Sequence, residues 1–215
     1  MTAVQAATDA RAVTLPWLLR RAAVLTWFEL PRVAAVCAIW MASLLPFTVA
    51  VLTGQWWLIA IGSLPATLLF TGMARFAAII LRGDRPRVRD AFAFDPVLAL
   101  SMSAAGTAVG LLVTEPTLEL LGFVVAAVVL VLAPYALAYG AVRGRRGLAT
   151  WRGAFILVAF RPSWALTVLA LFLIGGFIVV ASVGTLGLIA PVLLSVFTAG
   201  TVGHLLDVVD GRAAR

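Results

Sequence analysis

Long apolar runs separated by short gaps constrain this chain most, because each run is long enough to cross the hydrocarbon core of a membrane. A membrane-spanning helix needs about 20 predominantly apolar residues. Six such runs lie at about residues 33–53, 56–81, 96–113, 117–142, 163–183 and 186–206. Backbone N–H and C=O groups within lipid must be satisfied inside the segment, so each run should be helical. The sequence therefore predicts an all-α polytopic membrane helix bundle, with six transmembrane helices arranged as three hairpins.

Positive charges alternate with these runs and predict their orientation. All sixteen positive residues are arginine, and fifteen of them lie before the first run, between the second and third runs, between the fourth and fifth runs, or after the sixth. The gaps after the first, third and fifth runs contain no arginine. Short loops rich in arginine stay on the cytoplasmic side of a membrane. We therefore expect both termini and both arginine-rich loops to lie in the cytoplasm.

Composition argues against several other classes of protein. The chain is 63% hydrophobic and 12% charged, whereas soluble domains are about 45–50% apolar and about 25% charged. Its net charge of +7 does not indicate nucleic-acid binding, because the arginines form no continuous face. They are better explained as topology determinants and as contacts for anionic lipid headgroups. A single cysteine and a single histidine argue against an intrachain disulfide and against a histidine–cysteine metal site.

The residues before the first apolar run predict a different kind of segment. In residues 14–30, tryptophan and aliphatic side chains are interrupted by arginine and glutamate, and the uninterrupted apolar stretch is too short to span. A helix that lies in the membrane interface fits this pattern, and residues 148–160 are a second candidate for such a placement. The predicted division is a cytoplasmic tail and interfacial helix at 1–32, a transmembrane domain at 33–206 and a cytoplasmic tail at 207–215.

Arg75 is the one arginine inside a predicted membrane span. An arginine at the centre of a membrane costs about 2.5–3.5 kcal/mol on insertion scales. One interpretation is a binding residue that faces a polar cavity. The other is that its long side chain extends to the headgroups, because Arg82 is seven residues, or about 10 Å of helix, further on. We favour the second interpretation on the sequence alone.

His204 and Asp207 form the other candidate pair. They lie three residues apart near the end of the sixth run and therefore share a helix face. They could form a proton relay, or they could be an interfacial histidine near a helix C-terminus and a solvated aspartate. We favour the second interpretation, because no further acidic residue lies in the interior of a predicted span. The chain contains no GxSxG, HExxH, Walker A or Rossmann motif, so no catalytic, cofactor-binding or metal-binding residue is predicted.

Several motifs from the second span onward resemble the YesL family of bacterial integral membrane proteins. These motifs are Pro65-Ala66-Thr67, Arg75, Leu81-Arg82-Gly83-Asp84, Val88-Arg89-Asp90-Ala91-Phe92, Ala133-Pro134-Tyr135, and the segment 143–160 followed by Pro162. The resemblance covers most of the chain from about residue 30. Members of the family tend to be encoded beside carbohydrate uptake systems. The resemblance therefore implies a bacterial cytoplasmic membrane location and an accessory role with an ABC transporter, and it implies no catalytic or ligand-binding residues.

The leading functional prediction is a non-enzymatic integral membrane protein that is an accessory component of a bacterial carbohydrate (ABC-type) uptake system. The alternative is a small self-contained oligomeric transporter, which the prolines inside the spans and Arg75 would suit. Gly106 and Gly110 have the spacing at which small residues let two membrane helices approach closely. The predicted partners are the lipid bilayer with its anionic headgroups, ABC transporter subunits and a second copy of the chain in a homo-oligomer, with no nucleic acid and no cofactor.

Overall fold

The computed structural model of the chain describes residues 14–182 and 184–213, and helices are the only regular secondary structure in these residues. In chain order the helices are α2 (Leu15–Phe28), α3 (Leu30–Ser43), α4 (Leu45–Thr53), α5 (Trp56–Arg82), the 3-10 helix η1 (Val88–Phe92), α6 (Pro96–Thr114), α7 (Glu119–Arg143), α8 (Leu148–Phe160), α9 (Pro162–Ala181), the 3-10 helix η2 (Thr185–Leu188) and α10 (Ala190–Ala213). This all-α architecture confirms the predicted fold class.

Within residues 14–182 and 184–213, six helical spans are long and apolar enough to cross a membrane. They are Leu30–Thr53, Trp57–Arg82, Pro96–Thr114, Glu119–Arg143, Pro162–Ala181 and Ala190–Gly211. Their limits agree with the predicted apolar runs to within a turn or two of helix. The chain is therefore a multi-pass integral membrane protein.

The first span is broken into two helices at Leu44. α3 ends at Ser43 and α4 begins at Leu45, with Pro46 in its first turn. Proline has no N–H to donate and its ring clashes with the carbonyl of the preceding turn, so a helix ends easily just before it. Pro65 and Pro134, by contrast, lie inside the continuous helices α5 and α7.

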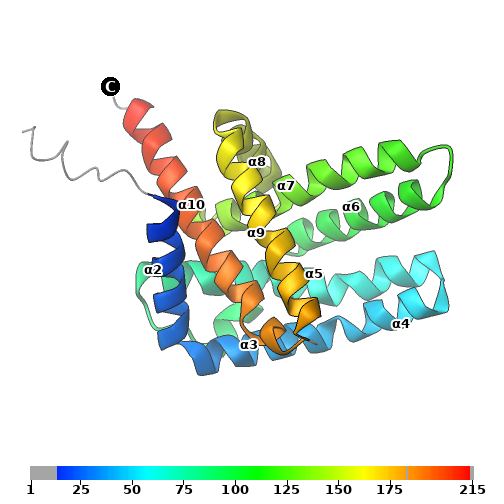
Figure 1. Ribbon diagram of the computed structural model, residues 1–215, viewed down its shortest axis with the longest axis horizontal. Helices are drawn as coiled ribbons and strands as arrows, with labels where there is room; N and C mark the ends of the chain where they lie inside the picture. The colour runs from blue at the N-terminus through cyan, green and yellow to red at the C-terminus, as the bar shows by residue number, and fades with distance from the viewer. Residues whose placement is uncertain (1–13, 183, 214–215) are drawn as a thin grey trace, which may run out of the picture.

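The spans form three hairpins that do not run in parallel. In Figure 1 the hairpins α4–α5 and α6–α7 extend side by side toward the right, whereas α9 and α10 run across them from top to bottom. We call the end that carries loops 83–95 and 144–147 and the last turns of α10 the arginine-rich end. The hairpin end is the opposite end, with the turns at 54–55 and 115–118. An ion pair between Arg143 and Asp210 joins α7 to α10 at the arginine-rich end.

The η2 turn packs against the middle of the first span instead of reaching the hairpin end. A Cβ atom added to Gly187 would lie 3.1 Å from the Sδ atom of Met41 in α3. In the part of the chain that the structure describes, η2 contacts α3, α9 and α10 but not α4, α5, α6 or α7. The tips of the hairpins α4–α5 and α6–α7 therefore have no helix of the third hairpin beside them.

The core lies where α5, α7 and α10 meet. In the most apolar stretch of each helix, 50% of the residues of α5 and 56% of those of α10 are buried, whereas 11% of those of α9 are. Met73 and Phe76 of α5, Tyr135 of α7 and Phe197 of α10 are among the largest fully buried side chains. Interiors packed in this way are dense and have low compressibility. The helix that carries Arg75 is therefore held firmly by its neighbours.

Helix α2 lies along α10 (Figure 1), where Leu18, Ala22 and Thr26 are buried. Its bounds match the segment predicted as an interfacial helix, while the placement of that helix in a membrane interface stays a prediction. Residues 1–13 of the predicted N-terminal tail lie outside the described residues. At the other end of the chain, α10 continues as a helix beyond residue 206 to Ala213.

Candidate functional site

Arg75 lines a cavity of about 330 Å³ at the arginine-rich end of the bundle. Ala78, Ile79 and Arg82 line the same cavity, and their spacing of three, four and seven residues from Arg75 places all of them on one face of α5. The remaining walls come from η1 and the residue after it, the end of α7, and the loop that leads into α8. These wall residues are Asp90, Ala93, Gly140, Ala141, Gly144 and Arg146.

The charge of the cavity is mainly positive. Three arginines, Arg75, Arg82 and Arg146, and one acidic residue, Asp90, line it. Within residues 14–182 and 184–213, none of the three guanidinium groups makes an ion pair or a hydrogen bond. Arg146 and Asp95 are the charged groups that act on Arg75 electrostatically.

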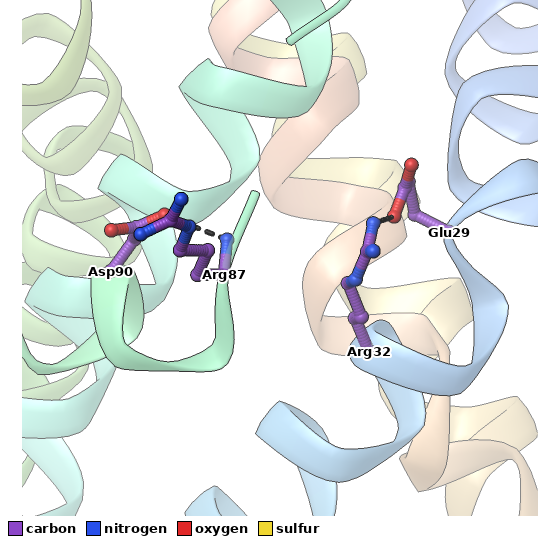
Figure 2. Close-up of polar contacts among 4 residues, drawn as sticks. All are labelled: Glu29, Arg32, Arg87 and Asp90. Atoms are coloured by element: carbon purple, nitrogen blue, oxygen red, sulfur yellow. Dashed lines mark hydrogen bonds and ion pairs between the residues drawn. The ribbon is translucent and has the colours of Figure 1, made fainter. Parts of the chain in front are cut away.

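The Asp90 carboxylate accepts a hydrogen bond from the backbone. Its Oδ2 atom accepts a hydrogen bond from the backbone N–H of Arg87 at 2.7 Å, which caps the start of η1. Figure 2 shows this contact, together with the ion pair between Arg32 and Glu29 at the corner between α2 and α3. Asp90 is therefore a structural cap of the loop as well as a wall of the cavity.

Asp95 organises the loops around the cavity and is not among the functional residues predicted from the sequence. Its side chain is only 3% exposed. Oδ1 accepts a hydrogen bond from the backbone N–H of Leu98 at 3.1 Å, and Oδ2 accepts one from the backbone N–H of Gly147 at 2.8 Å. Its own backbone N–H donates to Thr71 Oγ1 at 3.1 Å. The carboxylate of Asp95 thus joins the start of α6 to the loop that holds Arg146, and its backbone N–H adds a link to α5.

Part of this role could have been recognised in the sequence. An aspartate directly before a proline at the start of an apolar run is a typical helix N-cap, and Asp95 precedes Pro96 in this way. The bond to Gly147 spans 52 residues along the chain, and local patterns do not encode such a contact.

For Arg75, the two interpretations drawn from the sequence converge in the structure. The side chain is partly exposed, and the cavity that it lines lies at the end where Arg82 ends α5. If the Arg75 side chain extends toward the headgroups at that end, it also faces the polar cavity. Arg75 lies about two turns deeper along the helix than Arg82.

His204 and Asp207 line a second cavity, of about 320 Å³, between α2 and α10. Trp17 and Arg21 of α2 line it as well, and the Arg21 guanidinium lies 5.2 Å from the centre of the Trp17 ring. The His204 ring lies 6.1 Å from that of Trp164 in α9, centre to centre. In the described residues no hydrogen bond joins His204 to Asp207, so the pair shares a cavity without forming the direct link of a relay.

The described residues contain no group of three histidine, cysteine, aspartate or glutamate side chains placed to hold a metal ion. Comparisons of the chain with protein-family models, with curated proteins and with solved structures gave no match. They do not bear on the resemblance to the YesL family, which stays a prediction. The fold alone defines the class of this protein, a multi-pass integral membrane protein.

Proposed function

We propose that the chain is a non-enzymatic accessory subunit of a carbohydrate (ABC-type) uptake system in a bacterial cytoplasmic membrane. The observation that carries this proposal is the unpartnered tip of the hairpin α6–α7. The carbohydrate part rests on the resemblance of the sequence to the YesL family. A surface that binds another membrane protein is what an accessory subunit needs, and the hairpin tip offers one.

The tip of the hairpin α6–α7 is apolar and open. In the described part of the chain α6 contacts only α5, α7 and α8. Leu111 of α6 is 43% exposed, and Leu120, Phe123 and Val124 of α7 are 80%, 55% and 55% exposed. Apolar side chains that face lipid are ordinary in a membrane, so a protein contact on this surface needs a further feature.

Two glycines distinguish this surface. A Cβ atom added to Gly106 or to Gly110 would meet no atom within 4 Å. The two residues are four apart and lie on one face of α6. By contrast, a Cβ on Gly122 would lie 2.7 Å from the Val113 backbone N, and one on Gly62 would lie 2.8 Å from the Pro46 carbonyl oxygen. Those glycines serve contacts inside the chain, whereas the small-residue face of α6 is left free for a helix of another chain.

The polar cavity at Arg75 also fits a non-enzymatic role. Its described walls carry guanidinium groups, one capping carboxylate, small side chains and backbone. Nucleophilic catalysis needs a nucleophile within hydrogen-bond reach of a base, and no such pair lines this cavity among the described residues. Its composition is that of a site that binds.

The experiment is affinity purification of the tagged chain from native membranes under mild detergent. A transporter subunit should co-purify in stoichiometric amount with the wild type. Gly110→Leu should abolish the association, because the new side chain projects from the open face of α6, where an added Cβ atom meets nothing within 4 Å. Gly176→Leu in α9 is the matched control, since a Cβ there also meets nothing within 4 Å. Absence of any transporter subunit, or its retention by Gly110→Leu, would contradict the proposal.

The transporter alternative is favoured by one observation, the polar cavity at Arg75. A transporter also needs a polar path across the bundle. Among the described residues, the cavity of about 220 Å³ between α3–α4 and α5 is lined mainly by apolar side chains, including Trp40, Phe47 and Phe70. The geometry therefore supports an accessory subunit better. Solute flux into reconstituted vesicles that is lost in Arg75→Ala would reverse this preference.

A further inference from the structure

The cavity at Arg75 is electrostatically incomplete. Its four charged lining residues are three arginines and one aspartate, so three positive charges less one negative charge leave +2. The buried Asp95 nearby lowers this to +1, yet both of its oxygen atoms accept backbone N–H groups. The Oδ2 atom of Asp90 likewise accepts the Arg87 N–H. The two carboxylates therefore bind backbone N–H groups, whereas the three guanidinium groups have no hydrogen-bond partner in the part of the chain that the structure describes.

The need to stabilise helix ends does not explain this concentration of arginines. A cation on the last turn of a helix interacts favourably with the negative end of the helix dipole, which accounts for Arg82 at the end of α5. Arg75 lies about two turns further in, inside a candidate membrane span. Arg146 lies in the loop beyond α7 and is placed beside Gly147, whose N–H is bound by Asp95. Stabilisation of a helix end therefore does not account for the presence of Arg75 or Arg146 at the cavity.

We propose that this cavity is a binding site for a phosphate group, held by the guanidinium groups of Arg75, Arg82 and Arg146. A phosphate monoester carries a charge of about −1.5 to −2 and three strong acceptor oxygens, which matches three guanidinium groups and the net charge of the walls. Guanidinium groups bind phosphate through paired, charge-assisted hydrogen bonds. Asp90 is the one lining group that repels the anion, and it is turned toward Arg87.

The size and position of the cavity define the class of ligand. Its volume of about 330 Å³ is at the lower end of ligand sites, which measure about 300–1,000 Å³. It holds a phosphate group with a small substituent, not the chains of a lipid. At the arginine-rich end the phosphate could belong to an anionic lipid headgroup or to a soluble phosphate. The inference is independent of the proposed subunit contact, because that contact uses Gly106 and Gly110 of α6.

The first arm of the test measures binding of inorganic phosphate to the full chain in detergent by calorimetry and by the shift of thermal unfolding. Buffers without phosphate and of equal ionic strength are the reference. Wild type should bind phosphate saturably. Arg75→Gln and Arg146→Gln should each weaken binding about tenfold or more, the factor that corresponds to about 1.4 kcal/mol. Arg152→Gln is the matched control, because Arg152 is exposed on α8 and does not line the cavity.

The second arm uses lipid nanodiscs made of phosphatidylcholine with or without phosphatidylglycerol. Native mass spectrometry reports which lipid stays bound. Retention of phosphatidylglycerol by wild type and Arg152→Gln, but not by Arg146→Gln, assigns the phosphate to a headgroup. Saturable binding of inorganic phosphate in the first arm, without selective retention of phosphatidylglycerol in the second, assigns it to a soluble ligand.

Arg146→Gln guards against misfolding, because Arg146 is an exposed loop residue. Its unfolding temperature without phosphate should equal that of wild type. Binding in neither arm overturns the proposal. So does an equal loss of binding in Arg152→Gln, which would mean that general positive charge and not this cavity attracts the anion.

Discussion

Replacing Asp95 by alanine should destabilise the protein more than any other loss of an acidic side chain in the described chain. The substitution removes the N-cap of α6, a loss of about 1 kcal/mol. It also leaves the buried N–H of Gly147 without its acceptor at 2.8 Å, which costs about 1–3 kcal/mol. The two losses together predict a decrease of about 2–4 kcal/mol in the free energy of unfolding.

The assay is reversible unfolding in mixed micelles of mild detergent and dodecyl sulfate, followed by circular dichroism. Asp90→Ala is the matched control, since Asp90 lies in the same loop and its carboxylate accepts the single N–H of Arg87. Its loss should cost about 1 kcal/mol or less. If Asp95→Ala is no less stable than Asp90→Ala, the account of a three-way junction at Asp95 is wrong.

Three further substitutions test other contacts in the same unfolding assay. Gly72→Ala should cost about 3 kcal/mol or more, because its Cβ would lie 1.7 Å from the Ala91 carbonyl oxygen of η1; a neutral result would mean that α5 and η1 are not packed so closely. Arg143→Gln breaks the half-exposed ion pair with Asp210 and should cost about 0–1 kcal/mol, so a larger loss would contradict its exposure. Trp151→Phe removes the 2.8 Å hydrogen bond that its Nε1 donates to a serine of α6, and should cost about 1 kcal/mol; an unchanged stability would place that side chain elsewhere.

The sequence was informative about the spans because length and hydropathy alone define them. Residues 148–160 form the short helix α8 with the predicted limits. The Arg-Gly pairs at Arg82-Gly83 and Arg143-Gly144 end α5 and α7, with both glycines in the left-handed region at φ 83° and 65°. Each of these features depends on neighbours in the sequence, so a local pattern is enough to predict it.

Contacts between distant segments were not predictable in the same way. The packing of Gly187 against Met41, which leaves the tip of the hairpin α6–α7 unpartnered, joins residues of the first and last hairpins. Two interpretations of Arg75 were open at the level of sequence, because the position of Arg146 relative to Arg75 depends on the bond between Asp95 and Gly147. Tertiary packing decides such positions, and a hydropathy pattern carries no information on them.

The most direct test of the proposed accessory role is photo-crosslinking in intact cells from the open face of α6. Leu111→p-benzoylphenylalanine places the probe next to Gly110 at a side chain that is 43% exposed. Phe177→p-benzoylphenylalanine in α9, at a residue that is 74% exposed, is the control on another lipid-facing surface. We predict a crosslinked adduct with a transporter subunit from position 111 and none from position 177. Lipid adducts alone from both positions would contradict the account.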